Sequence, residues 1–133
     1  EPIEVFNNGQ HARDFTYVDD IVDGILRALD HVAAPDPGWD GSHPDPATSS
    51  APYRLYNIGS SRPVKLLDFI RAIEDATGRT AIMTMLPMQP GDVPETFADI
   101  SALSAATGFA PKIDIAEGMR RFVAWYRDFY RVA

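Results

Sequence analysis

Short strand patterns alternate with helical patterns along most of this chain, and the alternation limits its fold more than any other feature. Three stretches have the apolar pattern of strands, namely 3–6, 53–58 and 81–86. Four have helical spacing, namely 18–32, 66–77, a short stretch around Ile100 and Leu103, and 114–130. This order favours an α/β fold with a small, partly parallel sheet, right-handed crossovers and about four helices.

Local signals mark where several of these elements begin and end. The cluster Asn7, Asn8 and Gly9 follows the first strand and tolerates the positive φ of a turn. Gly78 and Gly108 are placed to end the second and third helices. Asp114 and Glu117 have the spacing of a capping box and predict the start of the last helix.

A chain of 133 residues has room for a single core, so one domain is expected over 1–133. Three short strands make a thin sheet, and covering both of its faces would need more chain than this. We therefore expect an exposed apolar patch where a neighbouring domain is missing. The first residue is Glu1 rather than methionine, which suggests that residues precede it.

The segment 33–52 interrupts the alternating pattern. It contains five prolines and two glycines together with Ser, Thr and Asp. Proline fixes φ and removes a backbone donor, so this segment is predicted to be a long surface loop inserted into the fold.

The composition excludes several classes of function. The chain has no cysteine, which rules out disulfides, thiolate nucleophiles and cysteine-ligated zinc. Its net charge of -7 argues against duplex nucleic acid or an anionic membrane as partner. No apolar run is long enough for a membrane span, and no secretory signal opens the chain, so a cytoplasmic protein is expected.

Searches for a catalytic or cofactor site find nothing in this chain. No tyrosine is followed four residues later by lysine. Gly38 and Gly41 lie in the proline-rich loop and do not form a phosphate-binding glycine fingerprint. His11, His31 and His43 are too scattered for a metal site and are interpreted as surface or capping residues. No catalytic, cofactor-binding or metal-ligating residue is therefore predicted.

Two short segments have the character of a binding surface. Arg13 follows a strand in a short loop, where neighbouring Asp14 could hold its guanidinium in the pose that suits a phosphate. Pro90 and Gly91 fix a bend from which Gln89 and Asp92 could offer amide and carboxylate groups to sugar hydroxyls. A salt-bridged arginine and an ordinary connecting turn remain alternative interpretations. A binding role requires both segments to face one common site.

Four segments read together resemble the carboxyl-terminal third of the extended short-chain dehydrogenase/reductase family. They are DFTYVDDIVDGILRAL, LYNIGSSRPVKLLDFIRAIE, LPMQPGDVPETFADISAL and EGMRRFVAWY. The resemblance is strongest to nucleotide-sugar epimerases of the UDP-glucuronate 4-epimerase type. It implies the carboxyl-terminal lobe of a Rossmann-type epimerase without its dinucleotide-binding domain.

The resemblance also implies roles for particular residues. The backbone at Val5 and Phe6 would lie against uracil, and Arg13 would meet the pyrophosphate. Gln89 and Asp92 would face the pyrophosphate and ribose, with Thr96 nearby. Galactose-type epimerases have an arginine where this chain has Gln89. That difference fits a glucuronate-type relative and puts phosphate contact by Gln89 in doubt.

In such enzymes the amino-terminal domain holds NAD and a Tyr/Lys pair, and the sugar is reversibly oxidised at C4. This chain would then be the UDP-sugar binding lobe of an enzyme that interconverts UDP-glucuronate and UDP-galacturonate, inactive and monomeric when isolated. Two alternatives remain open. One is the lobe of a UDP-glucose or dTDP-glucose epimerase or dehydratase, and the other is a free-standing, non-catalytic nucleotide-sugar binding module.

Overall fold

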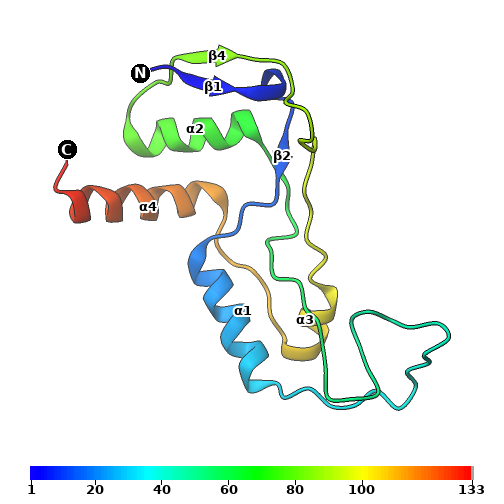
Figure 1. Ribbon diagram of the computed structural model, residues 1–133. Helices are drawn as coiled ribbons and strands as arrows, with labels where there is room; N and C mark the ends of the chain where they lie inside the picture. The colour runs from blue at the N-terminus through cyan, green and yellow to red at the C-terminus, as the bar shows by residue number, and fades with distance from the viewer. Residues whose placement is uncertain (133) are drawn as a thin grey trace.

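The computed structural model describes residues 1–132, so Ala133, the last residue of the predicted domain, lies outside the described residues. The elements in chain order are β1 (Ile3–Val5), the 3-10 helix η1 (Phe6–Gly9), β2 (Ala12–Arg13), α1 (Val18–Asp30), β3 (Val64–Lys65), α2 (Leu66–Thr77), β4 (Met83–Met85), α3 (Ser101–Thr107) and α4 (Ile115–Tyr130). Figure 1 shows α2 between the β1–β4 pair and α4, with α1 and α3 extending away from them.

The strands form two separate pairs. β1 and β4 run parallel with Val5 opposite Met85, and α2 precedes β4 in the connection between them. β2 and β3 run antiparallel with Arg13 opposite Val64. The α/β fold with parallel strands and four α-helices is thus confirmed over the described residues, although the strands do not join into one sheet.

The strand predicted over residues 53–58 is wrong. This stretch forms no strand and contributes one isolated bridge, between Thr48 and Arg54. Tyr53 and Leu55 are exposed. A strand needs a continuous partner edge. The loop offers this stretch only the Thr48 bridge and a hydrogen bond from Leu55 N to the Ala47 carbonyl.

Segment 33–52 is a loop that contains no helix and no strand beyond that bridge. Its bends are closed by aspartates that accept backbone N–H groups two residues ahead. Asp36 accepts from Gly38 at 3.0 Å, and Asp45 accepts from Ala47 at 2.8 Å. Figure 1 shows the segment projecting from the end of the molecule that carries α1 and α3.

The predicted end signals are confirmed for the turn and for the helices. Asn7 and Asn8 have φ of 50° and 49°, while Gly78 and Gly108 cap α2 and α3 in the left-handed region. Asp114 accepts the Glu117 N–H at 2.9 Å and caps α4. Only half of the capping box forms, since the Glu117 carboxylate accepts from Arg121 Nε instead.

The buried core is small. Its fully buried side chains are Val5, Leu103 and Phe109. Large apolar side chains remain exposed on α1 and α4, which confirms the predicted apolar patch. They include Val22, Ile25, Leu26 and Leu29 on α1, and Phe122, Trp125, Phe129 and Tyr130 on α4. None of the helices within residues 1–132 has the length and apolar character needed to cross a bilayer.

Candidate functional site

Arg13 is held at the end of β2 by chain segments distant from it in sequence. β2 pairs with β3 on one side, and on the other Ala12 forms a parallel bridge with Glu95. Ala12 N donates to the Pro94 carbonyl at 2.9 Å, and Thr96 N donates to the Ala12 carbonyl at 3.2 Å. These bonds bring the loop after β4 against Arg13.

The bend predicted at residues 89–92 is confirmed as a turn. The Asp92 N–H donates to the Gln89 carbonyl at 3.2 Å, and Gly91 has a φ of 84°. Proline at the second position and glycine with positive φ at the third are the residues that a type II turn requires. Gln89 is exposed, whereas Asp92 is partly buried.

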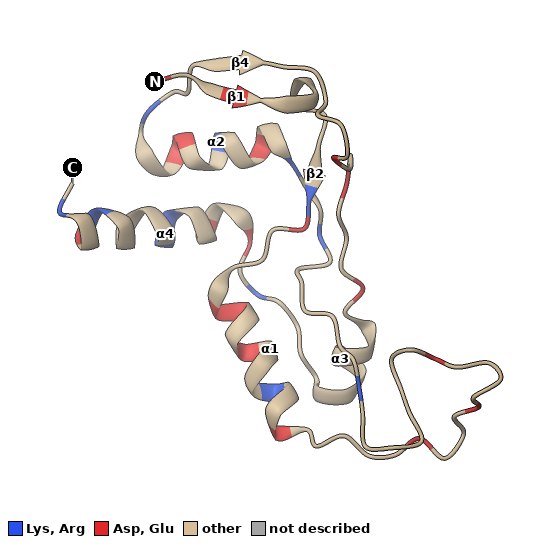
Figure 2. Cartoon of the chain, in the orientation of Figure 1, with Lys and Arg blue, Asp and Glu red and all other residues tan. Residues whose placement is uncertain are grey.

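Arg13 and this turn meet in an ion pair. Arg13 Nη2 lies 2.9 Å from Asp92 Oδ1, with the two side chains 25% and 31% exposed. Arg13 Nη1 donates to the carbonyls of Ala12 and Pro94 at 2.9 and 3.1 Å. In Figure 2 the basic end of β2 lies beside the loop that follows β4. The prediction that Asp14 holds the guanidinium is therefore wrong, because Asp92 does so.

Asp14 instead joins the segments behind the ion pair. Its carboxylate accepts backbone N–H groups from Ser60 and Ser61 at 3.0 Å each and from Ala98 at 2.9 Å. Burial raises the pKa of the Asp14 carboxyl, but hydrogen bonds from Ser60, Ala98 and Ser61 outweigh burial and leave the pKa below its usual range. A Cβ on Gly59 would lie 2.3 Å from the Ala98 Cβ, so the two segments meet closely.

Replacing Asp14 by asparagine is expected to lower the free energy of unfolding by about 3 kcal/mol at neutral pH, because the amide group would face N–H donors. A carboxyl whose pKa is lowered by folding contributes its stability above the unfolded value of 3.8 and loses it as the pH falls through the lower folded value. Urea unfolding at pH 7 and at pH 3 measures both effects, and the gap between wild type and variant should narrow at pH 3.

Asp128→Asn is the matched control, since Asp128 is exposed on α4. It should leave the free energy of unfolding unchanged. An Asp14→Asn protein as stable as wild type at pH 7 would contradict the structural role of Asp14.

The other predicted residues surround this site to different degrees. Thr96 Oγ1 accepts the Asp14 N–H at 3.2 Å. Because Glu95 bridges to Ala12 in parallel, Thr96 is the residue opposite Arg13. Val5 is 1% exposed, and its carbonyl accepts the Leu86 N–H at 2.9 Å. Phe6 is partly buried at the start of η1. The backbone hydrogen bond at the Val5 carbonyl is thus already used within the fold.

His11 is the site residue that sequence reasoning missed. It was interpreted as a surface or capping residue, and this is wrong because it is 6% exposed. Its Nδ1 lies 3.5 Å from Asp92 Oδ2. Residues i and i+2 of an extended segment share a face, so its place two residues before Arg13 was the available signal. No group of three His, Asp or Glu residues within 1–132 could hold a metal ion.

Gly38 and Gly41 do not form the glycine-rich turn that binds a dinucleotide phosphate. Gly38 lies in an aspartate-closed bend of the loop, with Gly41 nearby, and neither glycine leads from a strand into a helix. A hollow of about 800 Å³ lies between α2 and α4, and apolar residues such as Phe69, Ile73 and Phe122 line it. Arg13 and Asp92 do not line this hollow. The ion pair therefore lies outside this hollow, at a partly exposed site.

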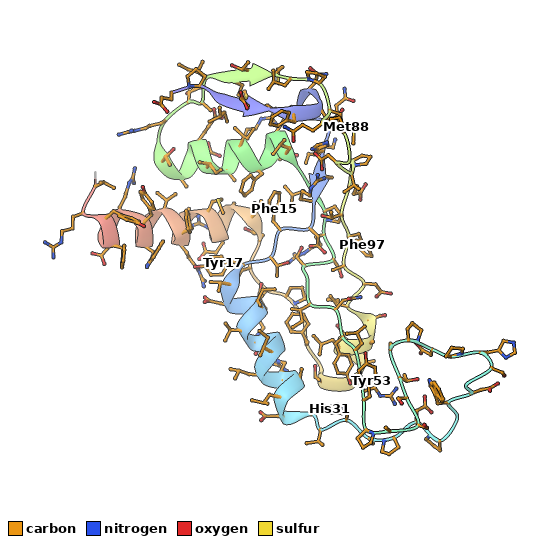
Figure 3. All side chains as sticks on the ribbon, viewed as in Figure 1. Phe15, Tyr17, His31, Tyr53, Met88 and Phe97 are labelled. Carbon is orange, nitrogen blue, oxygen red and sulfur yellow. The ribbon has the colours of Figure 1, made fainter. Side chains whose placement is uncertain are left out.

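Contacts of aromatic side chains connect the segment after β2 to the helices. The rings of Phe15 and Phe69 stack with centroids 4.1 Å apart, which ties the segment after β2 to α2. Arg121 of α4 lies 5.8 Å from the centroid of Tyr17, the residue before α1. Figure 3 shows Phe15 close to α2 and Tyr17 where α1 meets α4.

Several known proteins are similar to this chain. The NAD dependent epimerase/dehydratase family matches residues 1–59. Protein CapI of Staphylococcus aureus is 45% identical over 131 residues, covering 98% of this chain and 39% of that protein. UDP-glucuronate 4-epimerase 4 of Arabidopsis thaliana is 39% identical over 128 residues, covering 96% of this chain and 28% of that protein.

Solved structures of epimerases are also similar to this chain. The chain superimposes on the UDP-glucuronic acid 4-epimerase of Bacillus cereus, solved with UDP-glucuronic acid and NAD, with a TM-score of 0.74 and 26% identity. The match covers 98% of this chain and 36% of that one. The chain thus spans between 28% and 39% of the length of these relatives. The resemblance to the carboxyl-terminal portion of such an epimerase is confirmed.

Proposed function

We propose that this chain, which resembles the carboxyl-terminal portion of UDP-glucuronate 4-epimerases, is the substrate-binding lobe of an NAD-dependent enzyme that interconverts UDP-glucuronate and UDP-galacturonate. The observation that carries the proposal is the contact between Arg13 and Asp92. Two segments 79 residues apart in sequence bring a guanidinium and a carboxylate together at one partly exposed site. A binding role requires that Arg13 and Asp92 lie at one site.

Each site residue has a proposed role. Arg13 donates to the pyrophosphate of the substrate through the guanidinium hydrogens that Ala12, Pro94 and Asp92 do not use. Asp92 holds that guanidinium and faces the ribose, with Gln89 and Thr96 at the edges of the site. The backbone at Val5 and Phe6 lies against the uracil.

The redox chemistry belongs to another part of the enzyme in this proposal. That part binds NAD and supplies the tyrosine that exchanges a proton with the sugar hydroxyl. It covers the exposed apolar side chains of α1, including Val22 and Leu26, and closes the site from the other side. Residues 1–133 form the binding domain, which alone is monomeric and inactive. The protein acts in the cytoplasm, with no nucleic acid or membrane as partner.

Calorimetric titration of the 133-residue chain tests the binding role. UDP and UDP-glucuronate are expected to bind with similar dissociation constants, on the order of 0.1–1 mM. The affinity is weak because only half of the site is present, and similar because the chain contacts mainly the UDP portion. dTDP-glucose should bind more weakly.

The competing functions predict other results. Tighter binding of dTDP-glucose than of UDP-glucuronate would favour the lobe of a dTDP-sugar enzyme. If none of the three nucleotides at 5 mM gives heat or a shift in melting temperature, the proposal is contradicted. For UDP and UDP-glucuronate this concentration is roughly five times the weakest expected dissociation constant.

A further inference from the structure

The Asp92 carboxylate is shared by Arg13 and His11. Oδ1 accepts from Arg13, and Oδ2 lies 3.5 Å from Nδ1 of His11. We propose that His11 binds a proton when the diphosphate of a nucleotide sugar binds at Arg13, which makes His11 a positioning residue that acts through Asp92. The inference rests on the proposed function, because it needs a diphosphate at Arg13.

Two opposing effects set the charge of the His11 ring. The ring is buried, and its Nε2 has no hydrogen-bond partner, so a charged imidazole would keep one buried N–H without an acceptor. Its Nδ1 faces the Asp92 carboxylate, so a positive charge on the ring would be paired with a negative one. A change of charge beside Asp92 therefore changes the protonation of His11.

A bound diphosphate makes such a change. Arg13 and Asp92 together have no net charge, and Gln89 adds none, so the isolated pair attracts an anion only weakly. The Asp92 carboxylate also repels the incoming phosphate oxygens. A proton on His11 neutralises Asp92 and leaves the Arg13 charge available to the ligand.

Other charged groups near His11 lie on the segments that pair with β2. Lys65 on β3 is opposite Ala12, and Glu95 bridges to Ala12 from the other side. Both side chains are exposed, so solvent screens them. Asp92 and Arg13 are the partly buried charges in contact at this site, and they dominate the field at the ring.

Because proton uptake and ligand binding are coupled in this proposal, the pH dependence of binding measures the effect of His11. A proton bound together with the ligand strengthens binding as the pH falls, by up to about tenfold per pH unit. Histidine is the side chain that changes charge between pH 5 and 8. UDP-glucuronate is the appropriate probe because its diphosphate is a diester, whereas the terminal phosphate of UDP itself titrates near pH 6.

The experiment is calorimetric titration of the full chain with UDP-glucuronate in buffers of different ionisation heat at pH 6.5. The heats should report uptake of about 0.3–1 proton per bound ligand, and the dissociation constant should rise about three- to thirtyfold from pH 6.0 to 7.5. His11→Asn should abolish both effects. His43→Asn, which changes an exposed loop histidine, should abolish neither.

The outcomes separate the two proposals. Arg13-dependent binding of UDP-glucuronate without proton uptake by the wild-type chain overturns the role of His11 and leaves the proposed function intact. Proton uptake that persists in a folded His11→Asn protein also overturns it. If His11→Asn does not fold, the wild-type measurement and Asp92→Asn still decide, since Asp92→Asn must also remove the uptake. Absence of any binding overturns the proposed function and the inference with it.

Discussion

Replacing Arg13 by alanine is expected to weaken UDP binding by about 1.5–3 kcal/mol, or about ten- to 150-fold, because a charge-assisted bond to the diphosphate is lost. Asp92 would then lie next to the ligand without its arginine and would repel it. Calorimetric titration of both proteins with UDP gives the ratio directly. Arg13→Lys should recover only part of the affinity, since an ammonium cannot keep the forked contacts with Ala12, Pro94 and Asp92.

Arg71→Ala is the matched control, because Arg71 forms an exposed pair with Asp68 on α2. It removes the same charge from the chain and should leave UDP affinity unchanged. Thermal unfolding of each variant shows whether Arg13→Ala still folds. Equal affinity in a folded Arg13→Ala protein would remove Arg13 from the site.

Joining this chain to an amino-terminal NAD-binding domain is expected to have the largest effect. The isolated chain should not epimerise UDP-glucuronate, and a fusion with the amino-terminal part of the Bacillus cereus UDP-glucuronic acid 4-epimerase should raise turnover by about a thousandfold or more over background. The gain comes from bringing the bound sugar to the redox cofactor, because binding energy at the remote UDP portion positions the reacting carbon. The measurement is the amount of UDP-galacturonate formed, which is determined by chromatography.

Two variants of the fusion make this result specific. Arg13→Ala should raise the KM for UDP-glucuronate, whereas replacing the tyrosine of the added Tyr-x-x-x-Lys motif by phenylalanine should abolish turnover. A folded fusion that binds NAD and UDP-glucuronate but forms no UDP-galacturonate would defeat the assignment of substrate.

The local parts of the fold could be predicted because their causes are local. Each of these features follows from the conformational preference of one or two residues. They are the left-handed caps at Gly78 and Gly108, the N-cap at Asp114, and the turn at Pro90 and Gly91. The loop at 33–52 follows from its prolines.

The pairing of distant segments could not be predicted in the same way. Residues 53–58 have a strand-like composition, but no adjacent strand edge is available to them, so they form only the Arg54 bridge. Asp14 is the sequence neighbour of Arg13, but the tertiary structure pairs Arg13 with Asp92 and leaves Asp14 to accept backbone N–H groups. The burial of His11 beside Asp92 likewise depends on a contact across 81 residues.

The most direct test of the account is an NMR titration of the 15N-labelled chain with UDP. The account predicts that the amide signals of residues 11–14 and 89–96 shift together with one saturable binding curve, and that the exposed apolar face of α1 does not respond. If only residues of the hollow between α2 and α4 shift, and the amide signals of Arg13 and Asp92 stay unchanged, the claim that this chain binds the diphosphate is contradicted.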